Sequence, residues 1–160
     1  MVSKLKMGFD MTEWFITGAS HGFGLEITRE ALSRGDSVVA TARNPQAVLH
    51  ALPDGGDRLL AVGLDVSEPE QVSGAVDAAI EQFGRIDVLV NNAGRGLVGA
   101  VEETSDAEAR AIFDVNVFGM LAVTRAVLPH MRACTRRRSS RWRRSRRPRP
   151  TSWRRSASSR

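Results

Sequence analysis

The chain has 160 residues, which is enough for one domain with a hydrophobic core. We find no apolar run near the roughly 18 residues that span a bilayer, and Met1 to Asp10 lacks the apolar core of a signal peptide. We therefore expect a cytoplasmic protein without a membrane partner. Cys134 is the single cysteine, which excludes an internal disulfide and a cysteine-built zinc site, and we expect no metal.

The net charge of +5 averages two different segments. Residues 132–160 hold 13 Arg and no Asp or Glu, whereas residues 1–131 hold 10 basic and 18 acidic residues. Arg neutralises phosphates, and Trp142 and Trp153 could stack on bases, so this tail could bind nucleic acid without sequence preference. Composition alone supports that function, and we do not favour it. Dense like charge with few apolar residues predicts a disordered tail.

Short apolar strands alternate with helical patterns from residue 13 to residue 131, after an extension over residues 1–12 that contributes to no predicted element. Strands are predicted at Trp14 to Thr17, Ser37 to Thr41, Leu59 to Leu64 and Ile86 to Val90, and the first helix at Leu25 to Arg34. Gly35 is a suitable C-terminal cap for that helix. The strands are nearly continuous apolar runs, as expected when helices cover both faces of a parallel sheet.

Two capping boxes predict the starts of the later helices. The sequence Ser67-Glu68-Pro69-Glu70 should begin a helix that runs to about Phe83, and Ser105-Asp106-Ala107-Glu108 should begin a long helix that runs to about Met131. The long helix carries apolar residues on more than one face, so it should have partners on two sides. The fold class is therefore α/β with a doubly wound parallel sheet.

A glycine-rich loop follows the first strand directly and leads into a helix: Gly18-Ala19-Ser20-His21-Gly22-Phe23-Gly24. Glycines allow a tight turn and let backbone N–H groups approach a pyrophosphate, whose charge the helix N-terminus favours. An ordinary βα turn is the alternative. The spacing Gly-x-x-x-Gly-x-Gly differs from the more common Gly-x-Gly-x-x-Gly fingerprint.

Together with Asn91-Asn92-Ala93-Gly94 after the fourth strand, this loop closely resembles the short-chain dehydrogenases/reductases. The resemblance covers about Glu13 to Met131. It implies a Rossmann-type fold and an oxidoreductase that moves a hydride between NAD or NADP and a small carbonyl or alcohol substrate. It also implies homo-oligomers in the intact family, whose members pair through the long helix and its successor. Because this chain has only the first of these helices, its own assembly is an open question.

The resemblance assigns cofactor-binding roles to positions that match the family motifs. Gly18, Ser20, His21, Gly22, Phe23 and Gly24 form the cofactor loop, Asp65 and Val66 contact adenine, and Asn92, Ala93 and Gly94 line the ribose. It makes Asn91 a structural residue that ties strands together. Asp65 could instead cap the turn that follows it, and both asparagines could be turn residues.

Arg43 bears on which cofactor binds, because it follows the second strand, where a dinucleotide fold reads the adenosine ribose. An acidic residue there would bind the free 2′-OH of NAD, but that position holds Ala42, and the adjacent guanidinium could pair with a 2′-phosphate. His21 occupies a position where the resemblance places Arg or Lys in relatives that prefer NADP. We therefore expect NADP, with NAD as a possible cofactor; Arg43 as a solvated surface charge is the alternative.

The resemblance extends to one catalytic position and fails at three. Asn116 resembles the helix asparagine that holds a water in a proton relay, although a buried Asn serving its own helix is the alternative. The family's Ser, Tyr and Lys cannot be placed, since the chain has no Tyr and its only lysines are Lys4 and Lys6. We therefore expect this chain to be inactive or to act as a non-catalytic dinucleotide-binding fragment.

The abrupt change in composition at Arg132 favours a shift of reading frame. We expect residues 13–131 to form a partial domain of about four strands and the long helix, followed by an out-of-frame tail over 132–160. A domain without its later strands would expose apolar surface and an unpaired sheet edge.

Overall fold

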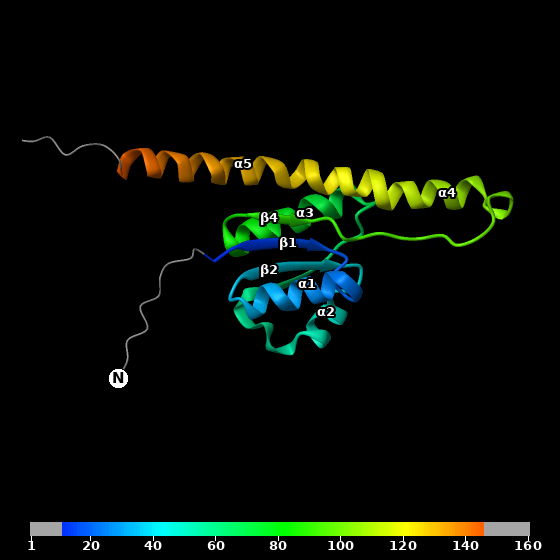
Figure 1. The fold of residues 1–160 in the computed structure, drawn as a ribbon, viewed down its shortest axis with the longest axis horizontal. Helices are drawn as coiled ribbons and strands as arrows, with labels where there is room; N and C mark the ends of the chain where they lie inside the picture. Colours follow the sequence, from blue (N-terminus) through cyan, green and yellow to red (C-terminus); the bar gives the residue numbers. More distant parts are fainter. Residues whose placement is uncertain (1–10, 146–160) are drawn as a thin grey trace, which may run out of the picture.

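The fold is seen in a computed structural model, which describes residues 11–145, with side chains to residue 133. Four parallel strands form one sheet in the order β3-β2-β1-β4 (Figure 1). The strands are β1 (Glu13–Thr17), β2 (Ser37–Ala42), β3 (Leu59–Gly63) and β4 (Val88–Val90). The predicted α/β class with a parallel, Rossmann-type sheet is confirmed.

Helices cover both faces of the sheet (Figure 1). They are α1 (Gly22–Ser33), α2 (Pro45–Ala51), α3 (Pro69–Phe83), α4 (Asp106–Phe113) and α5 (Met120–Ser145), with a π-helical segment, η3 (Asp114–Gly119), between the last two. Short 3-10 turns lie at η1 (Pro53–Arg58) and η2 (Val101–Glu103). Helices α1 and α2 lie on one face, and α3 and α5 lie on the other.

The core forms two layers because successive strand residues point to opposite faces. Phe15 and Val39 are buried against α3 and α5, in the cluster that includes Val123 and Val127 of α5. The intervening residues of the same strands, such as Ile16, are buried on the other face with residues of α1 and α2. This alternation accounts for the nearly continuous apolar strand sequences.

The end of α1 confirms the predicted glycine cap. Gly35 has φ of 91°, its N–H donates to the Leu32 carbonyl at 3.1 Å, and the Asp36 N–H donates to the Ala31 carbonyl at 3.1 Å. These are the two hydrogen bonds of a Schellman motif, in which glycine accommodates the left-handed residue.

The capping box predicted at Ser67 is wrong, whereas the one at Ser105 is confirmed. Helix α3 begins at Pro69 after Glu68, and no side chain caps it. Ser67 instead donates from both its N–H and its hydroxyl to Asp65 Oδ1. Hydrogen bonds to a charged carboxylate are stronger than hydrogen bonds between neutral groups. At α4, Ser105 and Glu108 make both hydrogen bonds of the box.

Several predicted bounds also need correction. Helix α1 begins at Gly22 rather than Leu25, β4 is only Val88–Val90, and α2 and η1 were not predicted. Helix α5 continues to Ser145, beyond the predicted end at Met131 and into the segment expected to be disordered. Arg is a good helix former, and an existing helix extends without a new nucleation cost. Residues 146–160 lie outside the described residues.

The expectation that no segment resembles a membrane span also needs correction. The helix over Asp106–Ala133 is long and apolar enough to cross a membrane by length and composition, with a mean hydropathy of 1.6 in an 18-residue window. The core helix of a soluble protein passes the same test. Val123 and Val127 of this helix are fully buried in the core against the sheet and α3, but only 17% of the apolar window is buried in the described structure.

Apolar side chains are exposed on the loop after β4 and on the helix that follows it, and β4 is an edge strand in the described part of the chain. Val98 and Val101 of the loop after β4 are almost fully exposed, and more than half of the surface of Phe113 and Phe118 is exposed on the helix. Both the predicted exposure of apolar surface and the predicted unpaired sheet edge are therefore present in the described residues.

Gly119, at the end of η3, allows the long helix to approach the loop after β3 closely. A Cβ atom there would lie 2.7 Å from Val66 Cγ2 and 2.9 Å from the Val66 carbonyl oxygen. The backbone atom cannot move as a flexible side chain could, so the helix would have to shift.

We expect Gly119→Ala to lower the free energy of unfolding by about 1–3 kcal/mol, because it overpacks this contact. Gly74→Ala is the matched control: Gly74 is exposed in α3 with nothing within 4 Å of an added Cβ, so alanine should stabilise by up to about 1 kcal/mol. Urea denaturation of both variants tests the contact. Equal stabilities would show that the helix does not depend on Gly119.

Candidate functional site

The candidate site is a cavity of about 750 Å³ at the carboxyl ends of the four strands. Strand β1 lies between β2 and β4, so the chain leaves the sheet in opposite directions on its two sides, which is where ligands bind in open α/β sheets. The volume is within the range of pockets for small molecules and cofactors.

Most residues predicted to bind the cofactor line this one cavity. They are Gly18, Ser20, His21, Gly22, Phe23, Arg43, Asp65, Val66, Asn92, Ala93 and Gly94. Ala42, which the sequence placed at the ribose-reading position, also lines the cavity. The sequence reasoning missed further lining residues: Asn44, Leu64, Ser67, Arg95, Ala111, Asp114 and Val115. Most of these directly adjoin a predicted residue or strand end, which is the signal that could have found them, and Val115 adjoins Asn116. Ala111 and Asp114 come from the long helix and carry no such signal.

The glycine loop brings the start of α1 to the cavity. Gly18 and Gly22 have φ of 67° and 56°, which disfavours side chains there. Gly24 does not line the cavity. A Cβ on Gly24 would lie 2.4 Å from the Gly18 carbonyl oxygen, so its role is to let α1 pack against the loop.

The N-terminus of α1 carries no side-chain cap. His21 precedes the helix in an extended conformation, and its ring Nδ1 lies 2.9 Å from Ser20 Oγ instead of accepting from the helix N–H groups. No acidic residue lies in the first turn. The partial positive charge of the helix end is therefore uncompensated by these residues and favours an anionic group in the cavity.

Asn92 connects β4 to β1 through its side chain. Its Nδ2 donates to the carbonyl oxygens of Thr17 at 3.0 Å and Gly18 at 2.9 Å, while Thr17 Oγ1 accepts from the N–H groups of Asn92 and Ala93 at 3.0 and 2.9 Å. The amide of Asn92 is thus occupied by the β1 loop. This is the strand-tying function that we had assigned to Asn91.

Asn91 ties different elements together. Its Nδ2 donates to Thr124 Oγ1 at 3.0 Å, which links the end of β4 to α5. The role expected for Asn91 is therefore corrected: it joins strand to helix, and Asn92 joins strand to strand.

Asp65 lines the cavity and also caps the turn after β3. Its Oδ1 accepts from the Ser67 hydroxyl at 2.6 Å and from the Ser67 N–H at 3.0 Å. The Ser67 hydrogen bonds, with a smaller effect of the Arg43 charge, hold the pKa of Asp65 below its usual value. Asp65 is therefore a carboxylate at neutral pH. The alternative expectation, that Asp65 caps the turn that follows it, is confirmed for its Oδ1 atom.

Asn116 lies in the π-helical segment and not among the lining residues. Its Oδ1 accepts from the Arg95 N–H at 2.8 Å, and its Nδ2 donates to the Arg95 carbonyl at 2.8 Å. Both polar atoms of the amide are therefore used to position the loop after Gly94, which does line the cavity.

A glycine loop at the switch point of a parallel sheet is the architecture of dinucleotide-binding α/β domains. A family model described as short chain dehydrogenase matches residues 13–140. The chain belongs to the short-chain dehydrogenase family, whose members are oxidoreductases that bind NAD(P).

Relatives share this part of the chain. Oxidoreductase BOA17 of Botryotinia fuckeliana is 45% identical over 120 residues, which cover 74% of this chain and 44% of the relative. A 3-ketodihydrosphingosine reductase of Bacteroides thetaiotaomicron is 42% identical over 122 residues, 76% of this chain and 42% of that protein. The chain thus spans less than half the length of these relatives.

Solved structures show the same fold. A short-chain dehydrogenase from Streptomyces avermitilis aligns with a TM-score of 0.73 and 44% identity over 77% of this chain and 45% of that one. A 3-ketoacyl-(acyl-carrier-protein) reductase from Brucella melitensis, complexed with NADH, aligns with a TM-score of 0.71 and 37% identity over 74% and 50% of the two chains.

We expect Asn92→Asp to lower the free energy of unfolding by about 2–3 kcal/mol, because a carboxylate oxygen would face the two carbonyl oxygens that the amide now satisfies. Asn44→Asp is the control. Asn44 Oδ1 accepts from the Gln46 N–H at 3.1 Å at the start of α2, and aspartate retains that acceptor, so stability should change by no more than about 0.5 kcal/mol. Chemical denaturation of both variants gives the comparison, and equal losses would contradict the role of Asn92.

Proposed function

We propose that the chain is the cofactor-binding part of an oxidoreductase that prefers NADP(H) and moves a hydride between this cofactor and a small carbonyl or alcohol substrate. The observation that carries the proposal is the cavity of about 750 Å³ at the switch point, bounded by the uncapped N-terminus of α1. The dinucleotide would supply the hydride chemistry when bound. The chain's own residues would bind and orient it.

The polarity of the cavity fits a dinucleotide. Backbone N–H groups at the start of α1 would bind the pyrophosphate, and the loop containing Asn92, Ala93 and Gly94 would line the ribose. Asp65, with Oδ1 occupied by Ser67, would accept from the adenine amino group through its carboxylate. These assignments follow the family resemblance, and their support here is that the residues line one cavity.

The preference for NADP over NAD rests on the residues after β2. Ala42 and Arg43 both line the cavity, and the position suited to a ribose-binding carboxylate is occupied by Ala42. Arg43 is exposed, and its positive charge acts on Asp65. An exposed guanidinium beside the adenosine subsite would pair with a 2′-phosphate, and His21, when protonated, would add a second positive charge.

Fluorescence titration with NADPH and NADH tests the cofactor. We expect NADPH to bind more tightly, and Arg43→Ala to weaken NADPH binding by about tenfold or more with little effect on NADH, since a charged hydrogen bond contributes about 1.5–3 kcal/mol. Arg34→Ala is the matched control, because Arg34 follows α1, pairs with Glu30 at 2.7 Å and is not among the residues lining the cavity. Equal losses for both cofactors would contradict the proposed role of Arg43, and absence of binding would overturn the proposed function.

We expect no turnover of carbonyl or alcohol substrates by this chain, because general acid catalysis needs a positioned group beside the reacting oxygen and the sequence has no tyrosine. Absorbance at the NADPH band, followed with a panel of ketones and aldehydes, provides the measurement. A short-chain dehydrogenase of full length serves as the positive control. Cofactor-dependent turnover that Arg43→Ala reduces would show that the chain is an active enzyme.

A further inference from the structure

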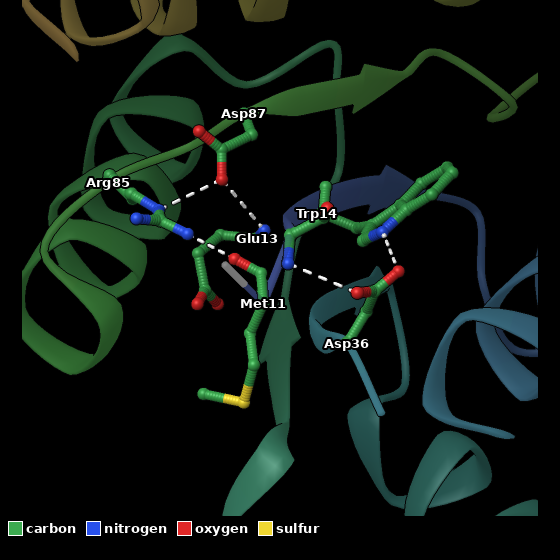
Figure 2. A network of polar contacts seen from close by, with 7 residues as sticks. Met11, Glu13, Trp14, Asp36, Arg85 and Asp87 are labelled. Carbon is green, nitrogen blue, oxygen red and sulfur yellow. Dashed lines mark hydrogen bonds and ion pairs between the residues drawn. The ribbon is translucent and has the colours of Figure 1, made fainter. Parts of the chain in front are cut away.

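A second polar network surrounds the start of β1 (Figure 2). It lies at the amino end of the strand, whereas the cavity lies at the carboxyl ends of the strands. The Thr12 N–H donates to Asp36 Oδ1 at 3.1 Å, and the Glu13 N–H donates to Asp87 Oδ2 at 3.1 Å. Asp36 precedes β2 and Asp87 precedes β4, so the chain is held from both neighbouring strands as it enters β1. Nothing in the proposed cofactor site uses these residues.

The network includes one cation and a tryptophan. Arg85 Nε pairs with Asp87 Oδ2 at 2.9 Å, and Arg85 also donates to the Met11 carbonyl oxygen. Trp14 Nε1 donates to Asp36 Oδ2 at 3.0 Å. Figure 2 shows these interactions converging on the backbone around Glu13.

The side chain of Glu13 is buried within this network. The residue is 7% exposed, and its Oε2 has no hydrogen-bond partner among the residues that the structure describes. Ser37 makes a side-chain hydrogen bond to the carboxyl group, but Oε2 is left without a partner. A buried carboxylate with an unsatisfied oxygen is costly, whereas a buried carboxylic acid is much less so. Burial accordingly raises the pKa of Glu13 above its ordinary value.

The surrounding charges do not favour ionisation strongly. The Ser37 hydrogen bond and, less strongly, the Arg85 charge act to lower the pKa of Glu13, while the charges of Asp87 and Asp36 act to raise it. Arg85 is already paired with Asp87. An ionised Glu13 would therefore be a third carboxylate beside a single cation in the described part of the network.

We propose that Glu13 is a proton-sensitive residue that couples pH to the attachment of β1: the strand is held most firmly when the Glu13 carboxyl is protonated, and ionisation weakens its amino end. Strand β1 is one of the two inner strands of the described sheet, between β2 and β4, and its other end is Thr17, which Gly18 follows. The state of this one proton therefore affects one of the strands whose carboxyl ends form the cavity.

The sign of the effect follows from the direction of the pKa shift. When the folded-state pKa is raised above that of the unfolded chain, the stabilisation is fully present below the unfolded-state pKa. It is lost as pH rises through the folded-state value. The protein should therefore lose stability from acidic toward neutral pH through this group.

Thermal unfolding of the full chain and of Glu13→Gln over about pH 4 to about pH 8 tests the proposal, because glutamine is a neutral isostere of the protonated acid. The difference in melting temperature, Gln variant minus unsubstituted chain, should rise with pH by about 3 °C or more. Glu26→Gln is the control, since Glu26 is exposed and pairs with Arg29 at 3.5 Å on the surface of α1. It should show no such pH-dependent difference.

A second measurement does not depend on the stability of the variant. The carboxyl ¹³C resonance of Glu13 in the unsubstituted chain, followed by NMR against pH, should titrate with a midpoint above that of an ordinary glutamate. A midpoint at or below the ordinary value would overturn the proposal. So would a melting difference between Glu13→Gln and the unsubstituted chain that does not change with pH.

Discussion

The hydrogen bonds between the end of β4 and the end of β1 determine the shape of the site. Asn92 and Thr17 exchange backbone and side-chain hydrogen bonds, and the Asn92 amide also reaches the Gly18 carbonyl. These contacts bring the glycine loop against the loop after β4. This close contact also requires that Gly24 has no side chain, because a Cβ atom there would clash with both Gly18 and the Asn92 amide. The cavity exists because these loops are in contact.

Strand β1 is held by different chemistry at its two ends. At the carboxyl end, neutral amide and hydroxyl groups satisfy backbone atoms, so the connection does not change with pH. At the amino end, Asp36 and Asp87 accept the backbone hydrogen bonds beside the buried Glu13, so the connection contains titratable groups. Ligand binding and proton binding would therefore act on the same strand from opposite ends of the sheet.

The location of the site was predictable because it depends on chain order. In a parallel sheet with helical crossovers, the carboxyl ends of all strands lie on one edge, so loops that are far apart in sequence meet there. The glycine loop, Arg43, Asp65 and the Asn92 to Gly94 segment each follow a recognisable strand, and each lines the cavity. Gly24 is the exception, because its position in the motif gives no indication that it faces Gly18 rather than the cavity.

The sequence by itself determined the parallel α/β fold, the Ser105 capping box, the Gly35 cap and the set of loops that form the site, because each depends on local periodicity, capping or strand order. Only the tertiary structure decided that Asn92 rather than Asn91 joins the strands, that Ser67 binds Asp65 instead of capping α3, and that Asn116 holds Arg95. In each case, neighbouring polar residues compete for partners. The choice depends on which donor and acceptor the packed chain brings within hydrogen-bonding distance, and that distance is not encoded in local sequence spacing.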